Sequence, residues 1–153
     1  MKKFLYLFVV VLMMVGLIAC FGSQNVAKFS LTISDATQKT VLTLTPDYSK
    51  RTLVIDYKKD FTDKKQQSSA STGQLGGDYF DRFEAMVKVV KAYKVPDGQV
   101  LDSKKANLVA MVEGKNKDVV SIQAAVDDKT KDVQDLINFY GDVVGLLMGS
   151  SPF

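Results

Sequence analysis

Few residues of this 153-residue chain are of a type that does chemistry. The only cysteine, Cys20, directly follows Leu17, Ile18 and Ala19, and the chain contains no histidine. Without histidine the common serine and cysteine nucleophiles lack their base, and the sequence contains no Ser-x-x-Lys or Gly-x-Ser-x-Gly motif. Zinc and copper sites also depend on histidine or cysteine ligands. The sulfur of Cys20 is therefore the most reactive group that the sequence offers.

The residues before Cys20 have the pattern of a secretory signal. Lys2 and Lys3 precede a run without charged residues that extends from Phe4 to Ala27, and small residues stand before the cysteine. The four residues Leu17-Ile18-Ala19-Cys20 resemble the lipobox of bacterial lipoproteins. The resemblance covers only residues 1–20. It implies cleavage before Cys20, a diacylglycerol on its sulfur and an acyl chain such as palmitate on its new amino group.

This resemblance implies an exported protein that is held at a membrane through acylated Cys20, because two or more acyl chains give a stable anchor. Phe21 stands where many lipoproteins kept at the inner membrane of Gram-negative cells carry Asp. In such a cell we expect the outer membrane, at its periplasmic or surface face. The alternative is an uncleaved anchor, since the uncharged run exceeds the ~20 residues that span a bilayer. The remainder is exported and tethered in either case.

We therefore expect a signal peptide at residues 1–19, a lipidated tether at 20–28 and a single domain at 29–153. The formal net charge of +3 includes Lys2 and Lys3, which would leave with the signal, so the domain is nearly neutral. It has no basic cluster interleaved with aromatic residues. We expect no nucleic-acid partner.

The hydrophobic pattern of the domain predicts three strands followed by a helix, and then two strands followed by a second helix. Alternating or β-rich segments predict strands at 29–34, 40–45, 51–58, 108–113 and 119–126. Helical spacing predicts one helix from Asp78, with Phe80, Phe83, Val87 and Val90 on one stripe, and a second from Asp127 to Met148. The order βββαββα predicts an α+β sandwich of two layers, with an antiparallel sheet of about five strands and two helices on one face.

Two further segments have a distinctive composition. Residues 61–77 are rich in Lys, Gln, Ser, Thr and Gly, which predicts a mobile polar loop. Gly141, Gly145 and Gly149 recur every fourth residue, which favours close packing of the second helix on the sheet or on the first helix. Glycine also lowers helix propensity, so the same residues are compatible with a break in that helix.

The acidic residues offer the remaining route to catalysis or metal binding. Glu84 and Glu113 are the only glutamates, and a glycosidase-like mechanism requires two facing carboxylates. Each is more simply interpreted as a surface residue. The aspartates lack the spacing and glycine of a calcium-binding loop. We expect no metal, no cofactor and no catalytic residue.

The leading hypothesis is thus a non-enzymatic, lipid-anchored envelope protein with a binding or structural role, with immunity or inhibitor lipoproteins as one subclass. Its partners would be the membrane and an unidentified protein of the envelope. The alternative is a carrier that holds an apolar ligand or lipid between the helices and the sheet. That hypothesis rests on aromatic and methionine residues at Phe80, Phe83, Met86, Tyr93, Tyr140 and Met148, which at helical spacing are also typical of an ordinary core.

Overall fold

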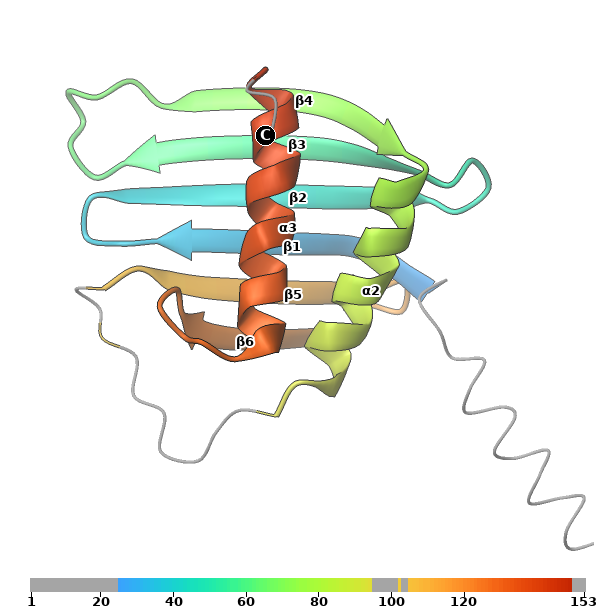
Figure 1. The fold of residues 1–153 in the computed structure, drawn as a ribbon. Coiled ribbons are helices and arrows are strands. Elements are labelled where there is room, and N and C mark those ends of the chain that lie inside the picture. The colour runs from blue at the N-terminus through green and yellow to red at the C-terminus, as the bar shows by residue number, and fades with distance from the viewer. Residues whose placement is uncertain (1–24, 95–101, 103–104, 150–153) are drawn as a thin grey trace, which may run out of the picture.

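The computed structural model describes residues 25–94, 102 and 105–149. Six antiparallel strands form one sheet, and two helices cross a single face of it (Figure 1). The predicted α+β architecture is confirmed, with one strand more than expected.

The first strand of the chain lies in the interior of the sheet. The strands are β1 (Val26–Ser34), β2 (Gln38–Asp47), β3 (Thr52–Phe61), β4 (Ser69–Gly76), β5 (Asn107–Gly114) and β6 (Val119–Ala125). Their order is β4-β3-β2-β1-β5-β6. A meander from β1 to β4 therefore builds one side of the sheet, and the β5–β6 hairpin adds to the other side of β1 (Figure 1).

Alternation in β1 buries Phe29 and Leu31 under the helices, as the sequence predicts. The strand begins earlier than expected, however. Val26 is only 1% exposed and belongs to the hydrophobic core, and it pairs with Gly114 of β5 across a register shift. The prediction that the tether extends to residue 28 is wrong, because residues 26–28 belong to β1 and the Val26 side chain is buried in the core.

The prediction of a mobile loop at 61–77 is also wrong for most of its length. Residues Ser69–Gly76 form β4, which pairs along its whole length with β3, from Lys59 opposite Ser69 to Thr52 opposite Gly76. Residues 62–68 and Gly77 remain outside a strand. Backbone hydrogen bonds to β3 form this edge strand, so its side chains need no apolar alternation.

Helix α2 (Asp78–Ala92) buries the predicted stripe of Phe80, Phe83, Val87 and Val90. The Asp78 side chain does not cap it. The cap residue is Gly77, whose φ of 60° lies in the left-handed region that favours glycine and lets β4 lead directly into the helix.

Helix α3 (Lys131–Leu147) begins later than predicted. Asp128 Oδ1 accepts a hydrogen bond of 2.8 Å from the Thr130 amide, and the Gln134 side chain donates to the Asp128 carbonyl at 2.5 Å. These bonds favour a turn at Asp128, so the helix starts at Lys131.

The three- and four-residue spacing along α3 predicts a buried stripe of Val133, Leu136, Ile137, Tyr140, Val144 and Leu147. The structure confirms Val133 and Leu136, but its other fully buried residues are Phe139 and Val143. Both helices pack on the sheet and on each other, which covers α3 on two sides. The helix runs without a break through Gly141.

The predicted close approach at the helix glycines does not occur at Gly141, where an added Cβ would meet nothing within 4 Å. It occurs instead on the sheet. A Cβ built on Gly73 of β4 would come within 2.6 Å of Leu147 Cδ2. A glycine in the edge strand therefore allows the C-terminal end of α3 to rest on β4.

Candidate binding surface

The residues of the predicted anchor, Leu17, Ile18, Ala19 and Cys20, lie outside the described part of the chain. The lipobox remains a prediction from the sequence. In the described ranges, neither helix has the length and apolar character needed to cross a bilayer.

The two glutamates are on opposite sides of the sheet. Glu84 lies on α2, which covers the helix side, while Glu113 alternates with buried Val112 on β5 and so points to the other face. The sheet between them prevents a facing pair of carboxylates. Within residues 25–94, 102 and 105–149, no three acidic, histidine or cysteine side chains gather as metal ligands.

The residues of the carrier hypothesis differ widely in burial. Phe80 and Phe83 are fully buried against each other, with ring centroids 5.7 Å apart, and Phe83 meets Phe29 edge-on at 5.9 Å. Met148 at the end of α3 is 56% exposed. Phe80 and Phe83 therefore pack as part of the core.

The two tyrosines of that hypothesis lie at different parts of the helix layer. Burial raises the pKa of Tyr140 to about 12, and its hydroxyl is hydrogen-bonded with the side chains of Thr40 and Tyr57. Among the described residues, the buried hydroxyl of Tyr93 at the end of α2 has no partner. The two hydroxyls thus form no common polar site.

The open face, by which we mean the sheet face opposite α2 and α3, is covered by no helix of the described residues (Figure 1). Side chains that alternate with the core residues point to it. The strand register sets two neighbouring rows across this face: Thr72, Asp56, Thr43, Ser30, Met111 and Ser121 in one, and Ala70, Lys58, Val41, Thr32, Val109 and Gln123 in the other. Hydroxyl and small apolar groups dominate, and the rows contain no aromatic side chain.

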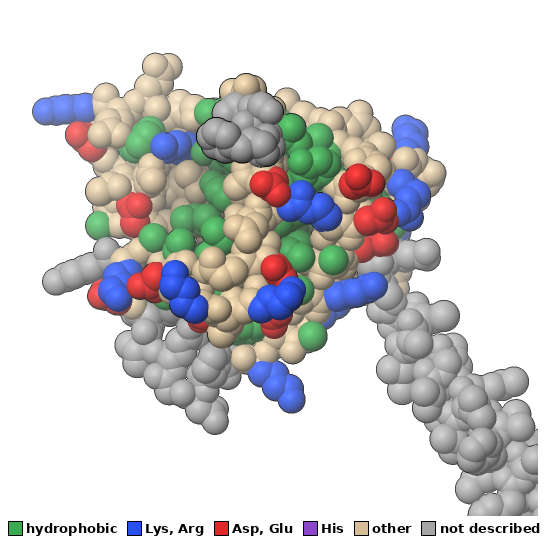
Figure 2. Space-filling model, viewed as in Figure 1, with side chains coloured by type: hydrophobic (Ala, Val, Ile, Leu, Met, Phe, Trp, Pro, Cys, Tyr) green, Lys and Arg blue, Asp and Glu red, His purple; other side chains and the backbone are tan. Residues whose placement is uncertain are grey.

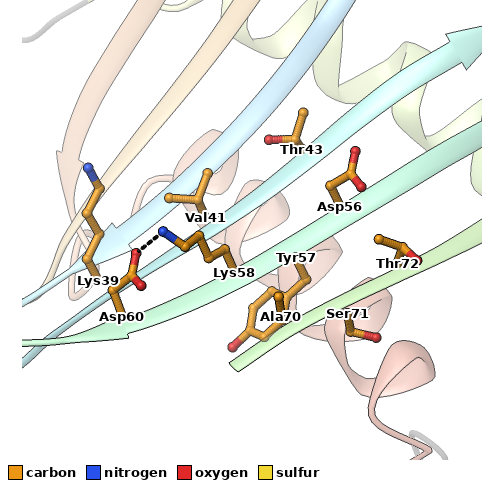
Figure 3. A pocket seen from close by; sticks show the side chains of 10 residues that line it. All are labelled: Lys39, Val41, Thr43, Asp56, Tyr57, Lys58, Asp60, Ala70, Ser71 and Thr72. Atoms are coloured by element: carbon orange, nitrogen blue, oxygen red, sulfur yellow. Dashed lines mark ion pairs between the residues drawn. The ribbon is translucent and has the colours of Figure 1, made fainter. Parts of the chain in front are cut away.

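A shallow hollow of about 480 Å³ lies on this face over β2, β3 and β4. Its charged lining residues are Lys39, Asp56, Lys58 and Asp60 (Figure 3). The Lys58 ammonium lies 3.0 Å from Asp60 Oδ2, and Lys39 stands opposite Asp60 in the register. Two lysines and two aspartates thus leave the hollow electrically balanced.

The hydrogen bond from Lys58 is the main cause that holds the pKa of Asp60 below its usual value, with a smaller contribution from the charge of Lys39. Asp60 is therefore ionised at neutral pH. The balanced charge offers no positive field for a phosphate backbone.

The helix side has a different character, because ion pairs there join separate elements of the fold. Acidic and basic side chains are interspersed over it (Figure 2). Arg51 before β3 pairs with Asp81 of α2, and Arg82 of α2 pairs with Asp142 of α3 at 2.5 Å. The first pair connects the sheet to α2 and the second connects the two helices, whereas the charges of the open face line a hollow.

The open face could not be predicted from the sequence as one surface. Alternation within each strand indicates which residues are polar and solvent-facing. Which of these residues are neighbours depends on the order of the strands and on β4. No protein-family model, curated protein or solved structure matches the chain.

Proposed function

We propose that this protein is a non-enzymatic, lipid-anchored protein of the bacterial envelope that binds another protein through its open face. The lipobox-like residues Leu17 to Cys20 support the anchor, with the outer membrane as its place in a Gram-negative cell. The absence of histidine supports a role without catalysis.

The open face is the single observation that carries the binding role. Six strands spaced about 4.8 Å apart, each about eight residues long at about 3.4 Å per residue, span roughly 800 Å². One partner of a standard protein–protein interface buries about 800 Å². The size of the face thus fits a protein, and its balanced charge argues against a nucleic-acid site, which needs a positive surface.

The binding role is tested by adding charge to this face. Thr43 lies near the middle of the open face, and Ala85 is exposed on α2 at the helix side. We expect the acylated wild-type protein and Ala85→Lys to retrieve the same partner from solubilised envelopes, and Thr43→Lys to lose it. Equal loss from both variants, or from neither, contradicts binding through the open face.

The anchor is tested separately with Cys20→Ser. This change removes the only sulfur nucleophile, so we expect no incorporation of labelled palmitate and a precursor that is not cleaved. A mature mass equal to that of the wild type would overturn the lipobox interpretation and leave the test of the open face unaffected.

A further inference from the structure

The distribution of charge among the strands is the reverse of what protects a sheet from edge-to-edge contact. Each of the interior strands β1, β2, β3 and β5 carries at least one charged residue, while the edge strands β4 and β6 carry none. Soluble proteins commonly guard exposed edges with lysine, proline or a bulge. The edges of this sheet lack the usual charges.

Strand β4 has none of these protective features. Its sequence, SASTGQLG, contains no charge and no proline, and its register with β3 is regular over all eight residues. Ala70, Thr72 and Gln74 are exposed. The outward N–H and C=O groups of this strand therefore form an uninterrupted edge of about 27 Å, at about 3.4 Å per residue.

Apolar side chains lie beside the same edge. Leu146 and Met148, which are 38% and 56% exposed, flank Leu147, the residue that rests on Gly73. On the open face, Val54 of β3 is 45% exposed and stands opposite Gln74. Exposed apolar groups thus border the edge on both faces, which adds hydrophobic burial to backbone pairing at this place.

We propose that β4 pairs antiparallel with β4 of a second copy of this chain, about a two-fold axis near Thr72. In an antiparallel pair directly opposite residues share a face, so the two-fold places Thr72 opposite its own copy and Ala70 opposite Gln74. No like charges oppose each other, and Thr–Thr pairs stabilise sheets. A charged partner strand would find no opposite charge on β4.

The proposed assembly is complete with two copies of the chain. A two-fold contact uses the same patch on both chains, so it consumes β4 and leaves β6 free. Both helix layers then lie on one side of a continuous sheet, and the two open faces join into one surface twice as wide. Pairing of β4 with β6 of another copy would instead build an open filament.

Site-specific disulfide formation tests this arrangement with the full chain in its membrane. Thr72→Cys places a thiol at the proposed axis, where opposite Cα atoms at about 5 Å permit a disulfide. Gln123→Cys is the matched control, an exposed polar residue on the open face of the other edge. The parent chain, with Cys20 alone, gives the background.

We expect the yield of covalent dimer from Thr72→Cys to be at least about tenfold higher than the yield from Gln123→Cys or from the parent chain. The reason is that only the thiols at position 72 would lie within bonding distance of each other. Equal cross-linking at both positions, a ladder of higher oligomers, or a lack of dimer at Thr72→Cys overturns the proposal.

A charge exchange provides a second readout without cysteine chemistry. Thr72→Lys would place two ammonium groups opposite each other, while Thr45→Lys adds the same charge at an exposed position of β2. By native mass spectrometry of the full chain in detergent, we expect Thr72→Lys to be monomeric and Thr45→Lys to dimerise. An equal mixture of Thr72→Lys and Thr72→Glu should restore the dimer. A dimer of Thr72→Lys alone refutes β4 pairing.

Discussion

Gly73→Ala is the sharpest test of the contact between α3 and β4. An alanine in a strand is favoured over glycine by about 0.5–1 kcal/mol, because the unfolded chain loses less freedom. Here the new methyl would lie 2.6 Å from Leu147 Cδ2, and overpacking costs about 1–3 kcal/mol. We therefore expect Gly73→Ala to lower the free energy of unfolding by about 1 kcal/mol.

The sign of this effect should depend on Leu147. Leu147→Ala removes the atom that the methyl would meet, so in that background Gly73→Ala should raise the free energy of unfolding by about 0.5 kcal/mol. The coupling between the two positions is then about 1.5 kcal/mol, within the range found for residues in contact. Urea-induced unfolding of the four proteins measures it.

Gly141→Ala is the matched control, because a Cβ there meets nothing within 4 Å. It should stabilise the helix by up to about 1 kcal/mol in either background. If Gly73→Ala stabilises the wild-type protein by the same amount as it stabilises Leu147→Ala, the end of α3 does not rest on β4 and the reasoning is refuted.

Three further predictions concern the core, the domain boundary and the hollow. Phe139→Ala should lower the free energy of unfolding by about 3–5 kcal/mol, because the fully buried ring leaves a cavity; a loss below about 1 kcal/mol in thermal or urea unfolding would place the ring outside the core. Val26→Asp should destabilise the domain by at least about 2 kcal/mol, since a carboxylate would replace a buried side chain; unchanged unfolding would return Val26 to the tether. Lys58→Met should raise the pKa of Asp60 toward 3.8 because it removes the main lowering hydrogen bond, so Asp60 protonates at higher pH in an NMR titration. Lys64→Met, in the loop after β3, is the control, and equal pKa values in both variants would contradict the assignment.

The strands and helices that carry apolar periodicity could be predicted from the sequence. Phe29 and Leu31 on β1, and the stripe from Phe80 to Val90 on α2, are buried as their spacing indicates. β4 could not be predicted in this way, because an edge strand gains its place through backbone pairing and its residues carry no hydrophobic alternation. The start of α3 was missed for a related reason, since Asp128 bonds locally instead of starting the helix.

The candidate surface depended on information that no single segment contains. The polar positions of each strand indicated a solvent-facing side, yet Thr43 and Met111 belong to one row only because β1 stands between β2 and β5. The charged residues of each strand follow from the sequence once the bounds of the strand are known. The identity of β4 and β6 as edge strands follows only from the order of the strands in the sheet.

The central place of β1 has a consequence for the order of folding. β1 can pair with β2 as soon as the turn between them forms, but its other neighbour, β5, follows only after β3, β4 and α2 have been made. Pairings between residues as far apart as Phe29 and Val112 carry a larger loop-closure entropy and slow folding. The core around Phe29 therefore stays incomplete until β5 is available. We propose that this chain is exported, and slow completion of the core would keep it in an unfolded form for longer before export.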